Sequence, residues 1–248
     1  MPSGPWRIIR RAALWLIVAE AAAFMLAVLI VAVATFIEHR AHPDGAAGWR
    51  PSPFVYALPA TVALQATLLF ADFRQGRYFG AGDVAAGLGA GPVRRRGLIA
   101  LLGALVVAWV LAYIFILVQF KSVANFIAKD VTPTPVLLMT GGPLLIIVRT
   151  VLIAVLAPLA EELFFRGWMW TALRRFWGVW STALCTGGVW LALHALEGAV
   201  RVPILVPTAI LLSLARHYGE SVRASIPIHI ANNMTAVAVQ LVATMAPR

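Results

Sequence analysis

Long apolar runs separated by short polar segments dominate the chain. Each run predicts a membrane-crossing helix, because about 20 apolar residues cross roughly 30 Å of hydrocarbon. The seven runs cover residues 12–37, 53–71, 98–119, 136–172, 180–195, 203–216 and 225–245. The fourth is long enough to protrude from the membrane or to break near Gly141, Gly142 and Pro143. The pattern predicts an all-α, polytopic membrane helix bundle of about seven, or eight, transmembrane helices.

The composition agrees with a membrane protein. Hydrophobic residues make up 61% of the chain, charged residues 12%, and the mean hydropathy is +0.87. A soluble domain carries about twice that share of charge. The first run is too long for a cleavable signal peptide and is expected to stay as a membrane anchor. The single cysteine, Cys185, cannot form an intramolecular disulfide.

Basic residues gather in short clusters between the apolar runs, and the formal net charge is +10. This placement follows the positive-inside rule, and no stretch resembles a nucleic-acid-binding module. We therefore expect a lipid bilayer, and no nucleic acid, as a partner. A cytoplasmic N-terminus places 12 arginines on the cytoplasmic side, against 6 basic residues on the other side. The twelve are Arg7, Arg10, Arg11, Arg74, Arg77, Arg94, Arg95, Arg96, Arg174, Arg175, Arg216 and Arg223.

Arginines outnumber lysines 18 to 2. This composition favours a prokaryotic inner membrane as the location. The largest loop on the cytoplasmic side, about residues 72–97, contains Gly80, Gly82, Gly87, Gly89 and Gly91 and ends in Arg94-Arg95-Arg96. It lacks the Gly-Lys-Ser/Thr signature of a phosphate-binding loop. A flexible connector with arginines near anionic lipid headgroups is the favoured interpretation.

Ionisable residues inside apolar runs cost about 3 kcal/mol each and indicate function by default. They are Glu20, Arg149, Glu161, Glu162, Arg166, His194 and His229, mostly in the C-terminal half. On a helix, Glu162 and Arg166 are four residues apart and can form an ion pair. Glu161 is rotated by about 100° and is left for another partner. A helix-end charge cluster at the interface is the alternative, but apolar and aromatic residues flank the group on both sides.

Two histidines on later runs are expected near Glu161. If the chain reverses near Gly178, the two helix legs contain 15 and 14 residues and measure about 21–22 Å each. An antiparallel hairpin then returns His194 to the depth of Glu161. His229 and Asn233 are four residues apart on one helix face, so both side chains can point at one ligand.

Three motifs thus occur in order on successive apolar runs: Glu-Glu-x-x-x-Arg at 161–166, Trp-x-x-x-His at 190–194 and His-x-x-x-Asn at 229–233. Over about residues 145–245 the set resembles the CPBP family, which comprises CAAX-type prenyl endopeptidases and bacteriocin-processing enzymes, also called Abi proteins. The family usually has phenylalanine at the position of Trp190, where the side chain packs rather than reacts. The resemblance implies an intramembrane peptidase of glutamate type or metal-dependent type.

The resemblance also implies roles for the matching residues. The catalytic set is Glu161, His194, His229 and Asn233, and the supporting set is Glu162, Arg166 and Trp190. Glu161 would act as general base on a water, assisted by His194. His229 and Asn233 would stabilise the tetrahedral oxyanion. Amide hydrolysis requires such an activated water and donors aimed at developing negative charge. Residues 1–134, with three spans, would be scaffold, and residues 135–248 would carry the motifs.

No cofactor is favoured. If zinc is bound, the candidate ligands are Glu161, His194 and His229, but the soluble zinc-protease signature His-Glu-x-x-His is absent. The expected partner is a membrane-anchored protein or peptide substrate. Two other functions stay open. One is a membrane scaffold or bacteriocin-immunity protein in which catalysis is dispensable, and the other is a proton-coupled transporter that uses Glu161 and the histidines as a relay.

Overall fold

The computed structural model describes residues 4–42, 53–119, 143–197 and 201–245, and the regular structure in these ranges is helical. The longer helices are α1 (Pro5–Ala41), α2 (Pro53–Phe79), α4 (Arg96–Gln119), α10 (Val179–Glu197), α11 (Arg201–Gly219) and α12 (Val222–Met245). Between α4 and α10, the segments α7 (Pro143–Val151), α8 (Ala157–Glu162) and α9 (Trp170–Leu173) form one helix of 31 residues with a kink at Gly167. Two π-helical stretches, Leu152–Leu156 and Leu163–Met169, interrupt this α7–α9 helix.

The described part of each of the seven predicted spans lies on a helix, and residues 136–142 of the fourth span lie outside the described residues. Five of these helices are long and apolar enough to cross a membrane within the described residues. They are Pro5–Ala41, Tyr56–Phe79, Pro143–Leu173, Val179–Leu196 and Val202–Gly219. An integral membrane protein follows from them, whereas a total of seven or eight spans stays a prediction. Gly141 and Gly142, where the fourth span was expected to break, lie outside the described residues.

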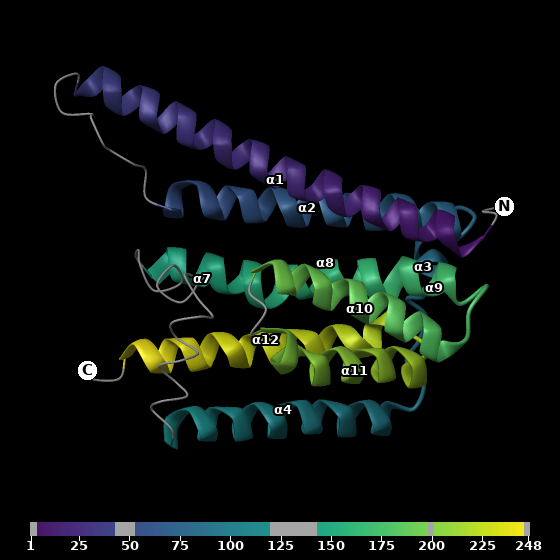
Figure 1. Ribbon diagram of the computed structural model, residues 1–248. Helices are drawn as coiled ribbons and strands as arrows, with labels where there is room; N and C mark the ends of the chain where they lie inside the picture. Colours follow the sequence, from purple (N-terminus) through teal and green to yellow (C-terminus); the bar gives the residue numbers. More distant parts are fainter. Residues whose placement is uncertain (1–3, 43–52, 120–142, 198–200, 246–248) are drawn as a thin grey trace.

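The long helices alternate in direction along the chain, and the start of α1 and the end of α12 lie at opposite ends of the bundle (Figure 1). α1 packs along α2, and α2 packs against the second π-helical stretch. α12 lies between α8 and α4, while α11 packs against α10, α12 and α4. The α7–α9 helix therefore lies inside the bundle, with neighbours on several sides.

The interior position of this helix follows from its sequence. From residue 164 to residue 173 it is apolar nearly all round, which is typical of a helix buried on every face. Phe164 and Trp168 have no exposed surface. The Trp168 ring stacks on Phe79 of α2, with 5.8 Å between the ring centroids. This packing fixes the second half of the helix and, through it, the preceding motif residues.

One end of the bundle collects the arginines that the sequence placed on the cytoplasmic side. We call it the arginine-rich end: α2, α9 and α11 end there, and α1, α4, α10 and α12 begin there (Figure 1). Several of these arginines also hold elements together. Arg11 of α1 donates to the Gln75 side chain of α2 at 3.4 Å, and Arg175 donates to the Phe79 carbonyl at 2.7 Å.

The glycine-containing segment at this end is not the flexible connector that we expected. α2 continues to Phe79, and the segment then includes the short helix α3 (Val84–Gly87). Gly87 lies so close to Gly76 of α2 that a Cβ on it would be 1.8 Å from the Gly76 carbonyl oxygen. The Gly91 carbonyl accepts a hydrogen bond from Ser221 at 2.6 Å. Close packing, for which glycine leaves room, holds the segment in place.

Candidate active site

A buried charge network lies where α8 meets α12. Arg166 Nη1 donates to Glu162 Oε1 at 3.0 Å, which is the ion pair predicted from the spacing. The same oxygen is 3.1 Å from Nδ1 of His229. Glu162 and Arg166 have no exposed surface, and His229 is 2% exposed. These residues are therefore not a charge cluster at a helix end. The ionised Glu162 can only accept, so His229 Nδ1 carries the proton of this hydrogen bond.

Glu161 turns to a different set of partners, as its position on the helix predicts. Its Oε2 accepts a hydrogen bond from Nε1 of Trp190 at 2.6 Å and lies 3.9 Å from Nε2 of His229. The Glu161 side chain is 19% exposed, whereas Glu162 beside it is fully buried. Of the two carboxylates, Glu161 is thus the one that a water or a substrate can reach.

The indole of Trp190, on α10, lies in the middle of the site. Its ring centroid is 4.4 Å from that of His194 and 5.5 Å from that of His229. The Arg166 guanidinium lies over the same ring at 5.2 Å. The expectation that this residue only packs was incomplete, because its N–H also holds Glu161. Phenylalanine, which the related family usually has here, has no donor to offer.

His194 reaches the cluster through Trp190. Its Nδ1 lies 2.9 Å from the Trp190 carbonyl oxygen, one helical turn earlier. A carbonyl oxygen accepts only, so Nδ1 carries the proton and the lone pair of Nε2 is left for another group. The side chain is partly exposed, which leaves room for a water beside it.

Asn233 contacts the α7–α9 helix at a different residue from the one that binds His229. Its Nδ2 donates to the carbonyl of Ile153 at 3.1 Å, within the first π-helical stretch. Asn232 donates to Asn233 Oδ1 at 3.3 Å and so fixes the direction of this amide. An amide nitrogen has two hydrogens, and the second remains for a ligand. His229 and Asn233 therefore share a helix face, as predicted, while each is held by its own partner.

The sequence interpretation missed two buried charged side chains near this site. Asp72 of α2 is 1% exposed and neighbours the Trp168 indole. It was assigned to a loop because the predicted span ended at residue 71. The helical spacing of Gln65, Asp72 and Gln75, all buried, would have shown one polar face. Arg216, which the sequence analysis placed on the cytoplasmic side without a structural role, is only 7% exposed.

The candidate zinc ligands Glu161, His194 and His229 do not form a metal site as they are arranged. Among the described residues, no group of three or more histidine, cysteine, aspartate or glutamate side chains could hold a metal ion. The atoms that would bind zinc are partly engaged elsewhere: Glu161 Oε2 with the Trp190 indole and His229 Nδ1 with Glu162.

Three helices of this membrane protein thus bring a partly exposed carboxylate and two histidines around one tryptophan. The model of the family described as type II CAAX prenyl endopeptidase Rce1-like matches residues 143–235, from the first residue of α7 into α12. This part of the chain is similar to that family, which is consistent with the CPBP resemblance, and it contains all three motifs. Comparisons with curated proteins and with solved structures found no match.

Proposed function

We propose that the protein is an intramembrane endopeptidase that hydrolyses a peptide bond of a membrane-associated protein or peptide. The observation that carries this proposal is the position of Glu161, which is partly exposed, held by Trp190 and 3.9 Å from His229 Nε2. A carboxylate that can reach water, next to imidazoles that can give or take protons, is the combination that amide hydrolysis needs. The Rce1-like family match supports a membrane peptidase.

In the first step Glu161 accepts a proton from a water, whose oxygen attacks the carbonyl carbon of the scissile bond. His194 assists by accepting a hydrogen bond from this water at Nε2, because its Nδ1 proton is engaged by the Trp190 carbonyl. The Trp190 N–H donates a hydrogen bond to the Glu161 carboxylate and so fixes the direction of the base. A positioned general base contributes about 10²–10⁴-fold to the rate.

The attack places negative charge on the former carbonyl oxygen. Nε2 of His229 and the second N–H of Asn233 are the donors that we assign to this oxyanion. Donation from Nε2 requires the doubly protonated imidazole, and the Glu162 carboxylate at Nδ1 compensates its charge. The carbon–nitrogen bond then breaks, and the proton held by Glu161 passes to the leaving amine. Loss of one oxyanion donor costs roughly 10²–10³-fold in rate.

Glu162 and Arg166 act on the site through His229. Neither side chain is exposed, so neither can meet a substrate without rearrangement. Their ion pair fixes the carboxylate that orients the imidazole. Removing one partner of a buried pair leaves an uncompensated charge, which costs about 3–5 kcal/mol. We therefore assign Glu162 and Arg166 as positioning residues.

The substrate class is the finer part of the proposal. The matching family is named for prenylated substrates, which supports a lipidated protein or peptide as the substrate. Peptides of one sequence, with and without a farnesyl group on a cysteine, would separate recognition of the lipid from recognition of the sequence.

The decisive experiment offers the purified protein a library of membrane-anchored peptides. The Glu161→Gln and His194→Ala variants are compared with Glu38→Gln and His39→Ala, which remove the same groups from the end of α1. We expect cleavage to fall by about 10²–10⁴-fold in the first two variants and to stay unchanged in the two controls. A chelator is added in a separate arm. Unchanged turnover is expected, because the proposed steps use no metal.

Other outcomes would point to the alternative functions. Equal cleavage by wild type and Glu161→Gln would refute the assigned base. Biological activity that survives Glu161→Gln, with no cleavage of any peptide, would favour a scaffold or immunity protein. Proton-dependent uptake of a solute into proteoliposomes would favour a transporter. Loss of turnover with the chelator, restored by zinc, would require a metal-dependent mechanism.

A further inference from the structure

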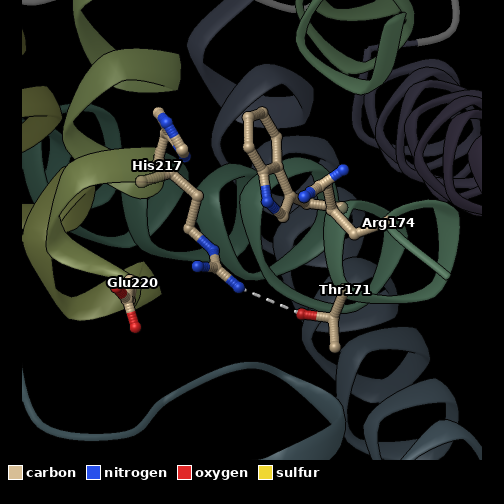
Figure 2. A pocket seen from close by; sticks show the side chains of 6 residues that line it. Thr171, Arg174, His217 and Glu220 are labelled. Carbon is tan, nitrogen blue, oxygen red and sulfur yellow. Dashed lines mark hydrogen bonds between the residues drawn. The ribbon is translucent and has the colours of Figure 1, made fainter. Parts of the chain in front are cut away.

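A cleft of about 360 Å³ opens at the arginine-rich end of the bundle, apart from the hydrolytic site. It lies between the end of the α7–α9 helix and the end of α11 (Figure 2). The six side chains that line it are Trp170, Thr171, Arg174, Arg216, His217 and Glu220. Figure 2 shows Arg174 and His217 on opposite sides, with Thr171 and Glu220 below them.

The charges in this cleft favour an anion. Arg174 and Arg216 each contribute a fixed positive charge. Glu220 is the acidic residue among the lining side chains, and its Oε2 lies 3.2 Å from Nη1 of Arg94. This exposed pair compensates the carboxylate at the rim. Glu220 therefore does not neutralise Arg174 and Arg216. Arg174 Nη1 donates to the Trp177 carbonyl at 2.5 Å, and the remaining N–H groups of the two arginines are left for a negatively charged ligand.

Arg216 is built into the structure rather than lying on its surface. It is 7% exposed, its Nε donates to the carbonyl of Arg166 at 2.7 Å, and its Nη2 donates to Thr171 Oγ1 at 3.2 Å, the bond dashed in Figure 2. Gly89 closes the other side, since a Cβ there would be 2.3 Å from the same Nη2. A guanidinium held in this way loses little freedom when it binds a ligand.

We propose that this cleft binds the phosphate of an anionic lipid headgroup. Arginine forks match phosphate oxygens, and basic pockets between helices at the membrane surface bind anionic headgroups. The cleft lies where the α7–α9 helix and α11, both long and apolar enough to span a membrane, come to an end. This is the level at which headgroups lie. Free phosphate has the same chemistry, so the experiment must separate the two sources.

Binding is measured on the full chain in mild detergent, by native mass spectrometry, with phosphatidylglycerol, phosphatidylcholine or inorganic phosphate as the probe. We expect phosphatidylglycerol to bind and phosphatidylcholine to bind much more weakly. The Arg174→Gln variant should weaken phosphatidylglycerol binding about tenfold, as expected for loss of one charged hydrogen bond. Arg174→Lys should lose less, because it keeps the charge.

The matched control is Arg223→Gln, which removes an exposed arginine at the same end but outside the cleft. Equal phosphatidylglycerol binding by Arg174→Gln and Arg223→Gln would overturn the proposed site, and so would absence of binding in wild type. Inorganic phosphate that displaces the lipid at micromolar concentration would identify free phosphate as the ligand instead. Thermal unfolding of each variant shows whether it is folded. The readout does not depend on hydrolysis, so the result is separate from that of the proposed function.

Discussion

At the scale of single residues, Trp190 distinguishes this site from the phenylalanine that the related family usually has. Its indole N–H holds Glu161 at 2.6 Å, and its ring contacts both histidines. We predict that Trp190→Phe keeps the ring packing but frees the carboxylate to rotate away from the water. Turnover should fall about tenfold, which corresponds to a hydrogen bond of 1.5 kcal/mol or more to a charged group. The measurement is kcat on the best peptide substrate.

Trp180→Phe provides the control for this prediction. Trp180 lies on the same helix, is 68% exposed and is not among the site residues. The same loss of an indole N–H there should leave kcat unchanged. If both variants behave like wild type, the hydrogen bond to Glu161 has no role in turnover, and Trp190 only fills space.

Some of these residue contacts could be predicted from the sequence, and others could not. The Glu162–Arg166 pair depends on helical spacing alone, because residues four apart share a face. The hydrogen bond between Trp190 and Glu161 joins two helices. Whether these two side chains meet depends on the relative depth of the helices, which the sequence does not give. Asn233 binds a backbone carbonyl of Ile153 that belongs to a π-helical stretch. Pro158 has no N–H to donate to the Ala154 carbonyl and so indicates disturbed helical bonding in residues 152–156, but it does not predict a π-helical stretch.

At the scale of elements, the π-helical stretches of the α7–α9 helix are held by side chains of other helices. Asn233 of α12 binds the Ile153 carbonyl in the first stretch. Arg216 of α11 binds the Arg166 carbonyl in the second, just before Gly167, whose ψ of −108° is not helical. Such stretches occur frequently at functional sites. Here they bracket the Glu161-Glu162 pair, so α11 and α12 both set the direction of the two carboxylates.

The contact between α2 and α3 yields a prediction at the same scale. Gly87→Ala would place a Cβ 1.8 Å from the Gly76 carbonyl oxygen and 2.6 Å from its carbon. Both atoms are backbone, so relief requires the two helices to separate. We expect destabilisation by about 1–3 kcal/mol, the usual cost of overpacking. Thermal unfolding in detergent, followed by circular dichroism, should show a lower Tm.

Gly97→Ala is the matched control, because a Cβ at Gly97 in α4 would meet no atom within 4 Å. Alanine also has a higher helix propensity than glycine, by about 1 kcal/mol. Its Tm should equal or exceed that of wild type. A Gly87→Ala variant as stable as Gly97→Ala would show that α3 moves freely against α2.

The sequence predicted the presence of each helix more accurately than the residue at which the helix ends. The predicted span 53–71 stops where the apolar run stops, but α2 continues for two more turns to Phe79. In those turns Asp72 and Gln75 face the interior, while Arg74 and Arg77 are exposed. A helix ends where its backbone hydrogen bonds end. Hydropathy indicates only whether the side chains favour lipid or water. The buried aspartate was missed for this reason.

At the scale of the whole molecule, the alternation of helix directions gathers twelve arginines at one end. Each of them lies near the end or the start of a helix that reaches this end, or in the connection beside it. The positive-inside rule assigns such an end to the cytoplasm. An anionic leaflet also attracts basic residues near its surface by about 1 kcal/mol each. These effects act together, and we predict a cytoplasmic arginine-rich end and N-terminus.

Single-cysteine labelling tests this orientation. In a Cys185→Ala background, Ala85→Cys places an exposed thiol in α3 at the arginine-rich end, and His39→Cys places one near the end of α1, at the opposite end. A membrane-impermeant maleimide added to spheroplasts of a bacterial host should label His39→Cys and leave Ala85→Cys unlabelled. Lysis should make both thiols reactive.

The reverse pattern would place the arginine-rich end outside. His229 is near the start of α12, which begins at this end, so the hydrolytic site would then lie nearer the outer surface. Substrates would have to approach from that side, and the anionic headgroups proposed for the cleft would belong to the outer leaflet. The expected pattern makes both sites accessible from the cytoplasm. One labelling experiment therefore decides from which side the substrate and the lipid are to be sought.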